Sequence, residues 1–280
     1  MNGRLLPWLC ITLASLLSAC SQTPLISPAA TAAQASSQRG TQAFSKGELA
    51  AAQREFTSAL HLYESLGDSA GRASSLLSLA RIYAQAGRTD DALAAVQAVL
   101  NDPSPTGGAQ MITAHGRAAA LLLAKGDTQL ADIQLTRAAA LCGADCSEAG
   151  ALWVLRARSA LLQQQPALAL KLATDALGLL TASTPPMRRP QASAERANAL
   201  RVQAQAYRAL GQHAAAADSA KSALELDRAL GLAERVQLDL DLLAQTYSAL
   251  GASALSQQYL TLAARARAAS RELRSNSLPD

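Results

Sequence analysis

Residues 63–93, YESLGDSAGRASSLLSLARIYAQAGRTDDAL, carry the clearest structural pattern of this 280-residue chain. Tyr83 lies four residues before Gly87, and small residues follow that glycine at five and twelve positions, at Ala92 and Val99. A glycine commonly ends a helix because it adopts the left-handed conformation without strain. Residues seven apart lie on the same face of a helix. The stretch therefore predicts two helices joined at Gly87.

The same spacing recurs along the chain at intervals of roughly 40 residues. The turn position is occupied by Gly47, Gly87, Gly126, Gln164, Gly211 and Gly251. Small residues lie five positions after it at Ala52, Ala92, Ala131, Ala169, Ala216 and Ser256. Others lie seven positions before it at Ala80, Ala119, Ala157, Ala204 and Ala244. Small side chains at these sites allow two helices to approach closely, which predicts a series of helix–turn–helix units.

This pattern resembles the tetratricopeptide repeat family over residues 39–270 or so, most strongly in residues 63–93. The first copy matches the family at Gly47, Ala52, Phe56, Ala59 and Leu60. The resemblance implies an all-α fold, a right-handed α-solenoid of about six repeats that spans residues 39–274. A generic alanine-rich helical bundle is the alternative.

The N-terminus has the layout of a bacterial lipoprotein signal. Arg4 precedes an uncharged apolar run, Leu5–Ala19, which is shorter than the roughly 20 residues that cross a bilayer. The tetrad that ends at Cys20, Leu-Ser-Ala-Cys, resembles a lipobox. The resemblance implies that residues 1–19 are removed and that Cys20 becomes a lipidated N-terminus. An ordinary cleaved signal is the alternative.

The residues after Cys20 bear on location and on domain boundaries. Ser21 takes the place of the aspartate that typically retains lipoproteins in the inner membrane, which favours a periplasm-facing position on the outer membrane. Residues 20–38 are uncharged and rich in Ala, Ser, Thr and Gln, so we expect a lipidated cysteine followed by a flexible tether. We expect residues 275–280 to form a disordered tail.

Composition limits the kinds of partner. The chain is 50% hydrophobic but only 3% aromatic, and its formal net charge is +4. The basic balance is a weak indication of acidic partners. The export signal argues against nucleic acid. In an oxidising compartment Cys142 and Cys146 could form a disulfide; free thiols or a metal site are the alternatives.

Features of catalysis are missing from the sequence. His61, His115 and His213 are isolated from one another, and no phosphate-binding loop, metal-binding motif or nucleophile elbow occurs. We therefore expect no enzyme, no metal and no cofactor apart from the covalent lipid on Cys20.

The resemblance places partner binding on a concave surface formed by the first helix of each repeat. Counting back from the turn residue predicts a groove lined by Arg81, Arg117, Arg158, Asn198, Arg201, Gln205, Arg208 and Gln245. Guanidinium and amide groups suit carboxylates and peptide backbone. The Lys and Asn set with which co-chaperones of the family hold a C-terminus is not reproduced. A solvated polar face is the alternative to a binding groove.

These features favour a protein-interaction scaffold in the cell envelope, serving secretion, pilus, outer-membrane or cell-wall machinery. The expected partner is a protein or peptide segment, with an acidic segment as one option, and the lipid provides the contact with the membrane. A small-ligand or glycan-binding lipoprotein that uses the superhelix cavity is one alternative. A structural homo-oligomer is another, and the oligomeric state stays open.

Overall fold

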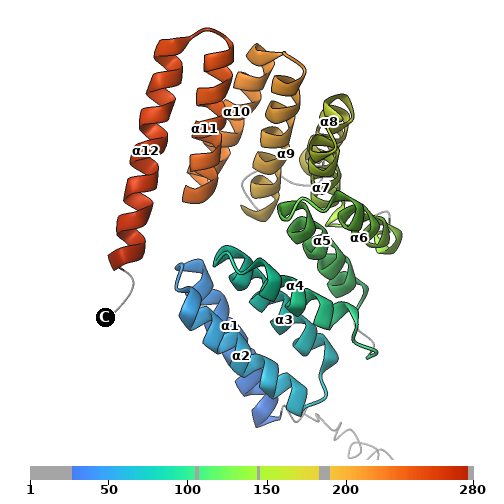
Figure 1. Cartoon of the computed structure of the whole chain (residues 1–280). Coiled ribbons are helices and arrows are strands. Elements are labelled where there is room, and N and C mark those ends of the chain that lie inside the picture. The colour runs from blue at the N-terminus through green and yellow to red at the C-terminus, as the bar shows by residue number, and fades with distance from the viewer. Residues whose placement is uncertain (1–26, 105–106, 144–145, 183–189, 277–280) are drawn as a thin grey trace, which may run out of the picture.

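The computed structural model describes residues 27–104, 107–143, 146–182 and 190–276. Within these ranges, twelve helices form six antiparallel hairpins (Figure 1). The pairs are α1 (Pro28–Ser45) with α2 (Leu49–Ser65), α3 (Ser69–Gln85) with α4 (Thr89–Leu100), α5 (Gly108–Ala124) with α6 (Thr128–Leu141), α7 (Ala149–Leu162) with α8 (Pro166–Ala182), α9 (Pro190–Ala209) with α10 (His213–Ala229), and α11 (Ala233–Ala249) with α12 (Ser253–Asn276).

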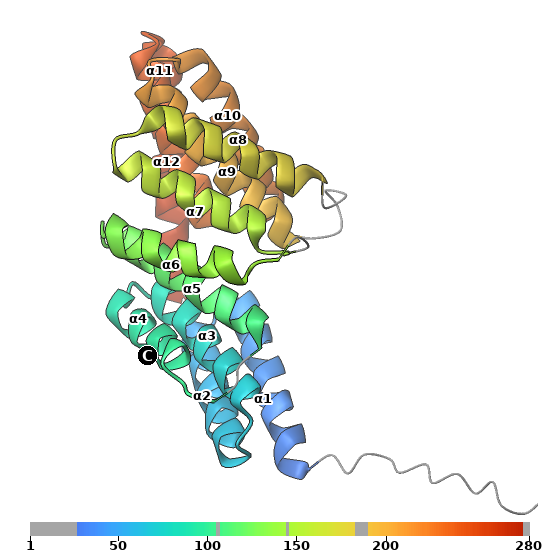
Figure 2. The same cartoon turned by 90° about the vertical axis from the view of Figure 1, so that its right-hand side faces the viewer.

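The hairpins follow one another along an arc, with α1 and α12 at its two ends (Figure 1). Turned by 90°, the same hairpins are stacked one above the next from α1 and α2 towards α11 (Figure 2). Each hairpin packs against its neighbours in sequence, which is the organisation of a solenoid. The predicted all-α fold with about six hairpins is confirmed.

The predicted turn residues end the first helix of each hairpin. At the first turn, the amide of Glu48 donates to the Ala43 carbonyl at 2.9 Å, and the amide of Gly47 donates to Phe44 at 3.0 Å. These two bonds form the Schellman motif, which requires a left-handed residue, and Gly47 has φ +80°. Gln164 adopts the same conformation at φ 59°, so the fourth hairpin keeps the turn without a glycine.

The close-packing positions are buried as the spacing predicts. The five alanines that follow the turn by five positions, Ala52, Ala92, Ala131, Ala169 and Ala216, are all fully buried. In the sixth hairpin the equivalent residue is Ser256, whose hydroxyl donates to the Ala244 carbonyl of α11 at 2.9 Å. A larger side chain at these sites would force the paired helices apart.

The turns between hairpins contain two glycines that the repeat pattern did not include. Gly67, between α2 and α3, has φ +65°, and Gly231, between α10 and α11, has φ +68°. Each lies 20 residues after a predicted turn glycine, Gly47 or Gly211, so the same spacing could have revealed them.

The expected tether is wrong over residues 28–38, which form the first part of α1. Pro28 opens that helix, where a missing amide hydrogen costs nothing. Alanine, which dominates this stretch, is also the best helix former. The helix buries Ala33, Ser36 and Gly40, and a Cβ atom at Gly40 would lie only 2.9 Å from the Phe56 ring of α2.

The expected boundary of the C-terminal tail is also wrong, because α12 continues through Asn276. Residues 277–280 lie outside the described residues, as do the signal sequence and Cys20.

Candidate partner-binding groove

The first helices of neighbouring hairpins form the inner layer of the arc. α3 contacts α5, α5 contacts α7, α7 contacts α9, and α9 contacts α11. No comparable contact joins successive second helices in the described part of the chain. Helices on the inside of a curved stack lie closer together than those on the outside, so the first helices line the concave side. The predicted groove residues all come from α3, α5, α7, α9 and α11.

Three of the predicted arginines reach from one first helix towards the next. The Arg81 guanidinium, on α3, lies over the Phe44 ring of α1, with 4.0 Å between its Cζ atom and the ring centroid. Arg117, on α5, donates a hydrogen bond to the Leu77 carbonyl of α3. Arg158, on α7, is half-buried beside α9, where it interacts electrostatically with Arg201. We call Arg81, Arg117 and Arg158 the arginine row.

The arginine row carries positive charge that the protein itself leaves unpaired. Within the described residues, none of the three guanidinium groups forms an ion pair with a carboxylate. Burial lowers the pKa of all three, and for Arg117 the pKa falls to about 10. The charge of Arg81 lowers the pKa of Arg117 further. All three groups remain charged at neutral pH, in surroundings that an anion would stabilise.

Two glutamates lie near the row without pairing with it. The charge of Glu148 raises the pKa of Arg117, and that of Glu195 raises the pKa of Arg158, but each effect is smaller than the lowering by burial. Both glutamates line a cavity of about 430 Å³ between α7, the end of α8 and the start of α9. The two glutamates would repel an anionic ligand from this cavity. An anion is therefore expected to approach the arginine row from another side.

The prediction that Arg201 lines the partner-binding groove is wrong. Arg201 is only 9% exposed and pairs with two carboxylates that are fully buried. Its Nε atom donates to Asp239 Oδ1 of α11 at 2.6 Å, and one terminal nitrogen donates to Asp227 Oδ2 of α10. Its other terminal nitrogen donates to Asn198 Oδ1 at 2.9 Å. We call Arg201, Asp227 and Asp239 the buried cluster.

The buried cluster has one more negative charge than positive when both aspartates are ionised. Asp227 Oδ1 is buried and finds no hydrogen-bond donor in the described residues. Burial raises the pKa of Asp239 to about 6; Arg201 acts in the opposite direction, and Asp227 adds to the rise. A proton shared by the two carboxylates would relieve this excess charge.

The remaining predicted groove residues take other positions. The Asn198 side chain already has two partners within the protein: it accepts a hydrogen bond from Arg201 and donates one to Glu195 at 3.1 Å. Gln205, Arg208 and Gln245 are exposed. The sequence reasoning missed Phe44, Glu148 and Glu195, although the aromatic character of Phe44 next to the first turn was a usable signal.

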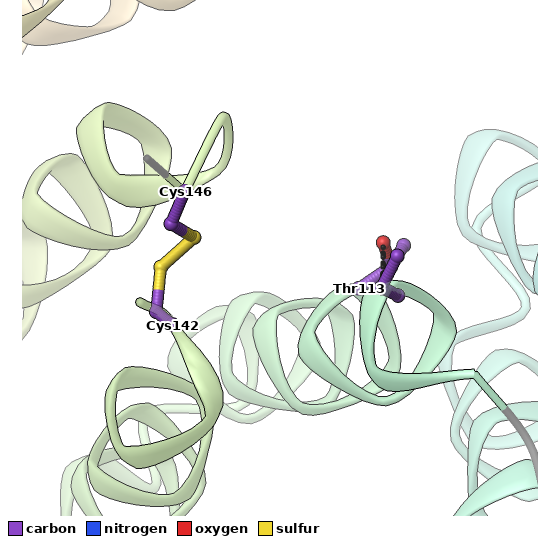
Figure 3. Close-up of a disulfide and its surroundings, with 4 residues drawn as sticks. Thr113, Cys142 and Cys146 are labelled. Atoms are coloured by element: carbon purple, nitrogen blue, oxygen red, sulfur yellow. Dashed lines mark hydrogen bonds between the residues drawn. A yellow bond between two sulfur atoms is a disulfide. The ribbon is translucent and has the colours of Figure 1, made fainter. Parts of the chain in front are cut away.

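The predicted cysteine pair lies at the joint between the third and fourth hairpins. Cys142 follows α6 and Cys146 precedes α7, and in the structure a disulfide joins them across a Cα–Cα distance of 5.3 Å. Figure 3 shows this disulfide and, apart from it, Thr113 on α5. The bond ties the end of one hairpin to the start of the next.

Within the described residues, no group of three or more His, Cys, Asp or Glu side chains could hold a metal ion. His115 is buried, with its Nδ1 atom 2.7 Å from Gln134 Oε1. None of the described helices combines the length and apolar character needed to cross a membrane.

Comparison with protein families and with curated proteins finds no match for this sequence. Among solved structures, it resembles the APC/C hetero-tetramer Cut9–Hcn1 with a TM-score of 0.64 and 17% identity, over 90% of this chain and 46% of that one. It resembles a signal-transduction ATPase with a tetratricopeptide repeat sensor from Pyrococcus horikoshii with a TM-score of 0.60 and 14% identity, over 89% of this chain and 36% of that one. It resembles BtubC (BKLC) from P. vanneervenii with a TM-score of 0.56 and 13% identity, over 88% and 93%.

The chain therefore spans less than half the length of the first two structures. Identities this low establish similarity of fold alone. The fold of the described residues is that of a tetratricopeptide-repeat-like α-solenoid.

Proposed function

We propose that this protein is an adaptor of the bacterial cell envelope that binds an acidic segment of a partner protein along its arginine row. The partner would belong to secretion, pilus, outer-membrane or cell-wall machinery. Three charged guanidinium groups without carboxylate partners carry the proposal. Arg117 and Arg158 are half-buried, whereas Arg81 is exposed. Desolvating a charge without pairing it is unfavourable, and a partner's carboxylates would offset that cost for the two half-buried groups.

The proposed location is the periplasmic face of the outer membrane, with the lipid on Cys20 as anchor. The charged start, the apolar run and the lipobox-like tetrad support anchoring, and Ser21 supports the outer membrane. A disulfide between Cys142 and Cys146 is compatible with that compartment, because disulfides persist where thiols are not kept reduced.

Charge reversal in the row tests the binding function. The full-length protein is crosslinked in intact membranes, and its partners are identified by mass spectrometry. The double variant Arg117→Glu/Arg158→Glu should lose the partner, because it replaces two attractive charges by two repulsive ones. Arg137→Glu is the matched control, since Arg137 is exposed on α6, a second helix outside the groove. Retention of every partner by a folded double variant would exclude the proposed groove.

Substitution of the lipidated residue tests the location. Cys20→Ser should abolish labelling by a radioactive fatty acid and move the protein from the membrane to the soluble fraction. Stable membrane attachment of this kind depends on the acyl chains, and Cys20→Ser removes the residue that would carry them. The shift to the soluble fraction should therefore be nearly complete. Cys142→Ser is the control, because it removes a different cysteine. Unchanged labelling and fractionation of Cys20→Ser would contradict the anchor.

A further inference from the structure

The buried cluster lies at the joint between the fifth and sixth hairpins. Arg201 belongs to α9 and Asp227 to α10, which together form the fifth hairpin, whereas Asp239 belongs to α11 of the sixth. The ion pair between Arg201 and Asp239 therefore crosses the joint. Leu240 and Leu243 of α11 are buried in the apolar contact of α11 with the fifth hairpin. The sixth hairpin is thus attached through an apolar surface that contains a carboxylic acid.

Two carboxylates share one guanidinium group in this cluster. One terminal nitrogen of Arg201 donates to Asp227 Oδ2 and, at 3.3 Å, to Asp239 Oδ2. Both aspartates are fully buried, and Asp227 Oδ1 has no hydrogen-bond donor in the described residues. A buried acceptor without a donor is costly, and so are two adjacent like charges. A single proton on the carboxyl pair removes both costs, because a protonated carboxyl can donate a hydrogen bond and the net charge of the cluster becomes zero.

The other polar groups around the cluster do not neutralise the second carboxylate. On α9, the remaining terminal nitrogen of Arg201 donates to Asn198, which is neutral. On α7, Arg158 interacts electrostatically with Arg201, and it forms an ion pair with neither aspartate. α12 packs against α11, and its Arg267 pairs with Asp241 instead. A proton is therefore the remaining means of balancing the cluster.

We propose that the joint between the fifth and sixth hairpins is proton-linked. A proton shared by Asp227 and Asp239 keeps the sixth hairpin docked, and loss of that proton to water loosens α11 and α12 while the other hairpins stay packed. The effect is local, because each hairpin of a solenoid is held by its neighbours and the sixth has a described neighbour on one side only (Figure 1). Local opening of such a unit costs less free energy than global unfolding.

The direction of the pH dependence follows from the burial of Asp239. Burial raises the pKa of Asp239 to about 6 in the docked hairpin, whereas an exposed aspartate has a pKa of about 4. The docked form thus holds a proton that the loosened form releases, so docking is favoured at low pH and weakens as pH rises through 6. A pKa difference of about two corresponds to a change of about 100-fold in the docking equilibrium.

Loosening of the sixth hairpin would alter one end of the groove and leave the arginine row in place. α11 is the last of the described first helices, and it contacts α9 in the inner layer of the arc. The arginine row comes from α3, α5 and α7, on other hairpins. Docking of the sixth hairpin and binding of an acidic segment to the row are therefore separate properties, and either can fail without the other.

Hydrogen exchange followed by mass spectrometry tests the joint in the full-length protein in detergent. Exchange is measured between about pH 5 and about pH 8 and is corrected for the intrinsic effect of pH on exchange. Protection of α11 and α12 should fall by about 10- to 100-fold over this range, whereas protection of α5 and α6 should stay constant. A uniform loss across all hairpins would contradict a local joint, and constant protection of α11 and α12 would contradict the proton link.

Substitutions assign the effect to the carboxyl pair. Asp239→Asn and Asp227→Asn each leave one carboxylate beside Arg201, so protection of α11 and α12 should become nearly independent of pH. Asp241→Asn is the matched control, because it changes another aspartate of α11, which pairs with Arg267 of α12. This control should keep the pH-dependent loss. Circular dichroism checks that each variant is folded. A pH-dependent loss that persists in both Asp239→Asn and Asp227→Asn would overturn the proposal.

Discussion

Arg117 on α5 and Arg201 on α9 occupy adjacent groove positions of the repeat, nine and ten residues before their turn residues, but differ in the folded protein. Both were predicted to line the groove, and both come from the inner layer of first helices. Arg117 bonds to a backbone carbonyl and has no carboxylate partner in the described residues, whereas Arg201 bonds to two buried aspartates. The same residue type is thus available to a ligand in one hairpin and used for internal packing in another.

The difference shows that partners on neighbouring helices decide what a groove arginine does. The carboxylates that neutralise Arg201 come from α10 and α11, one on the second helix of its own hairpin and the other on the next hairpin. Within the described residues, no carboxylate forms an ion pair with Arg117. An arginine that has internal partners supports stability, and one that lacks them is free to support binding.

The largest expected effect is the loss of stability on replacing Arg201. Arg201→Met leaves Asp227 and Asp239 buried without their cation, so the free energy of unfolding should fall by about 3–5 kcal/mol. Urea unfolding followed by far-UV circular dichroism measures the change. The matched substitution Arg117→Met strands no carboxylate and costs one hydrogen bond, so it should change stability by about 1 kcal/mol or less. Equal losses in the two variants would contradict the contrast between the two arginines.

A smaller effect is expected in the pH dependence of the buried cluster. The pKa of Asp239 is raised to about 6 in the folded state, so between about pH 4 and pH 6 the folded protein binds a proton that the unfolded chain does not. Asp239 should therefore contribute stability that is present at low pH and is lost as pH rises through 6. The contribution amounts to about 3 kcal/mol at most.

The variant Asp239→Asn isolates this contribution. The amide resembles the protonated acid but does not titrate, so the variant should lack the pH-dependent stability that comes from Asp239. The stability of the variant relative to the natural protein should therefore decline as pH falls from 7 to 4. The groups that face Asp239 are Arg201 of α9 and Asp227 of α10, with Asn198 completing the contacts of Arg201. Parallel stability curves for the two proteins across this range would show that Asp239 does not titrate there.

The fold could be predicted because its causes are local and repeated. A left-handed turn residue and small residues at fixed offsets determine each hairpin, and even the degenerate copy at Gln164 obeyed the spacing. The start of α1 was missed because an uncharged stretch rich in alanine and serine suits either a tether or a helix. What distinguishes the two is the surface of α2, against which α1 packs, with Gly40 close to the Phe56 ring.

The candidate site could be predicted only in part because pairing across hairpins is not periodic. Counting back from the turn residue of each repeat placed Arg81, Arg117 and Arg158 on first helices, where the structure has them. Register could not show that Asp227 and Asp239, 26 and 38 residues further along the chain, would neutralise Arg201. Asp239 lies between Leu238 and Leu240, which is an indication of burial but names no partner, whereas Asp227 is followed directly by Arg228.

The early start of α1 has a consequence for how far the protein could extend from a membrane. With the lipid on Cys20 as proposed, only residues 21–27 separate the anchor from the first helix, a span of about 25 Å at full extension. The longer tether expected from the sequence would have allowed about 60 Å. The repeat array would thus work within a thin zone next to the bilayer, and a partner would have to bring its acidic segment into that zone.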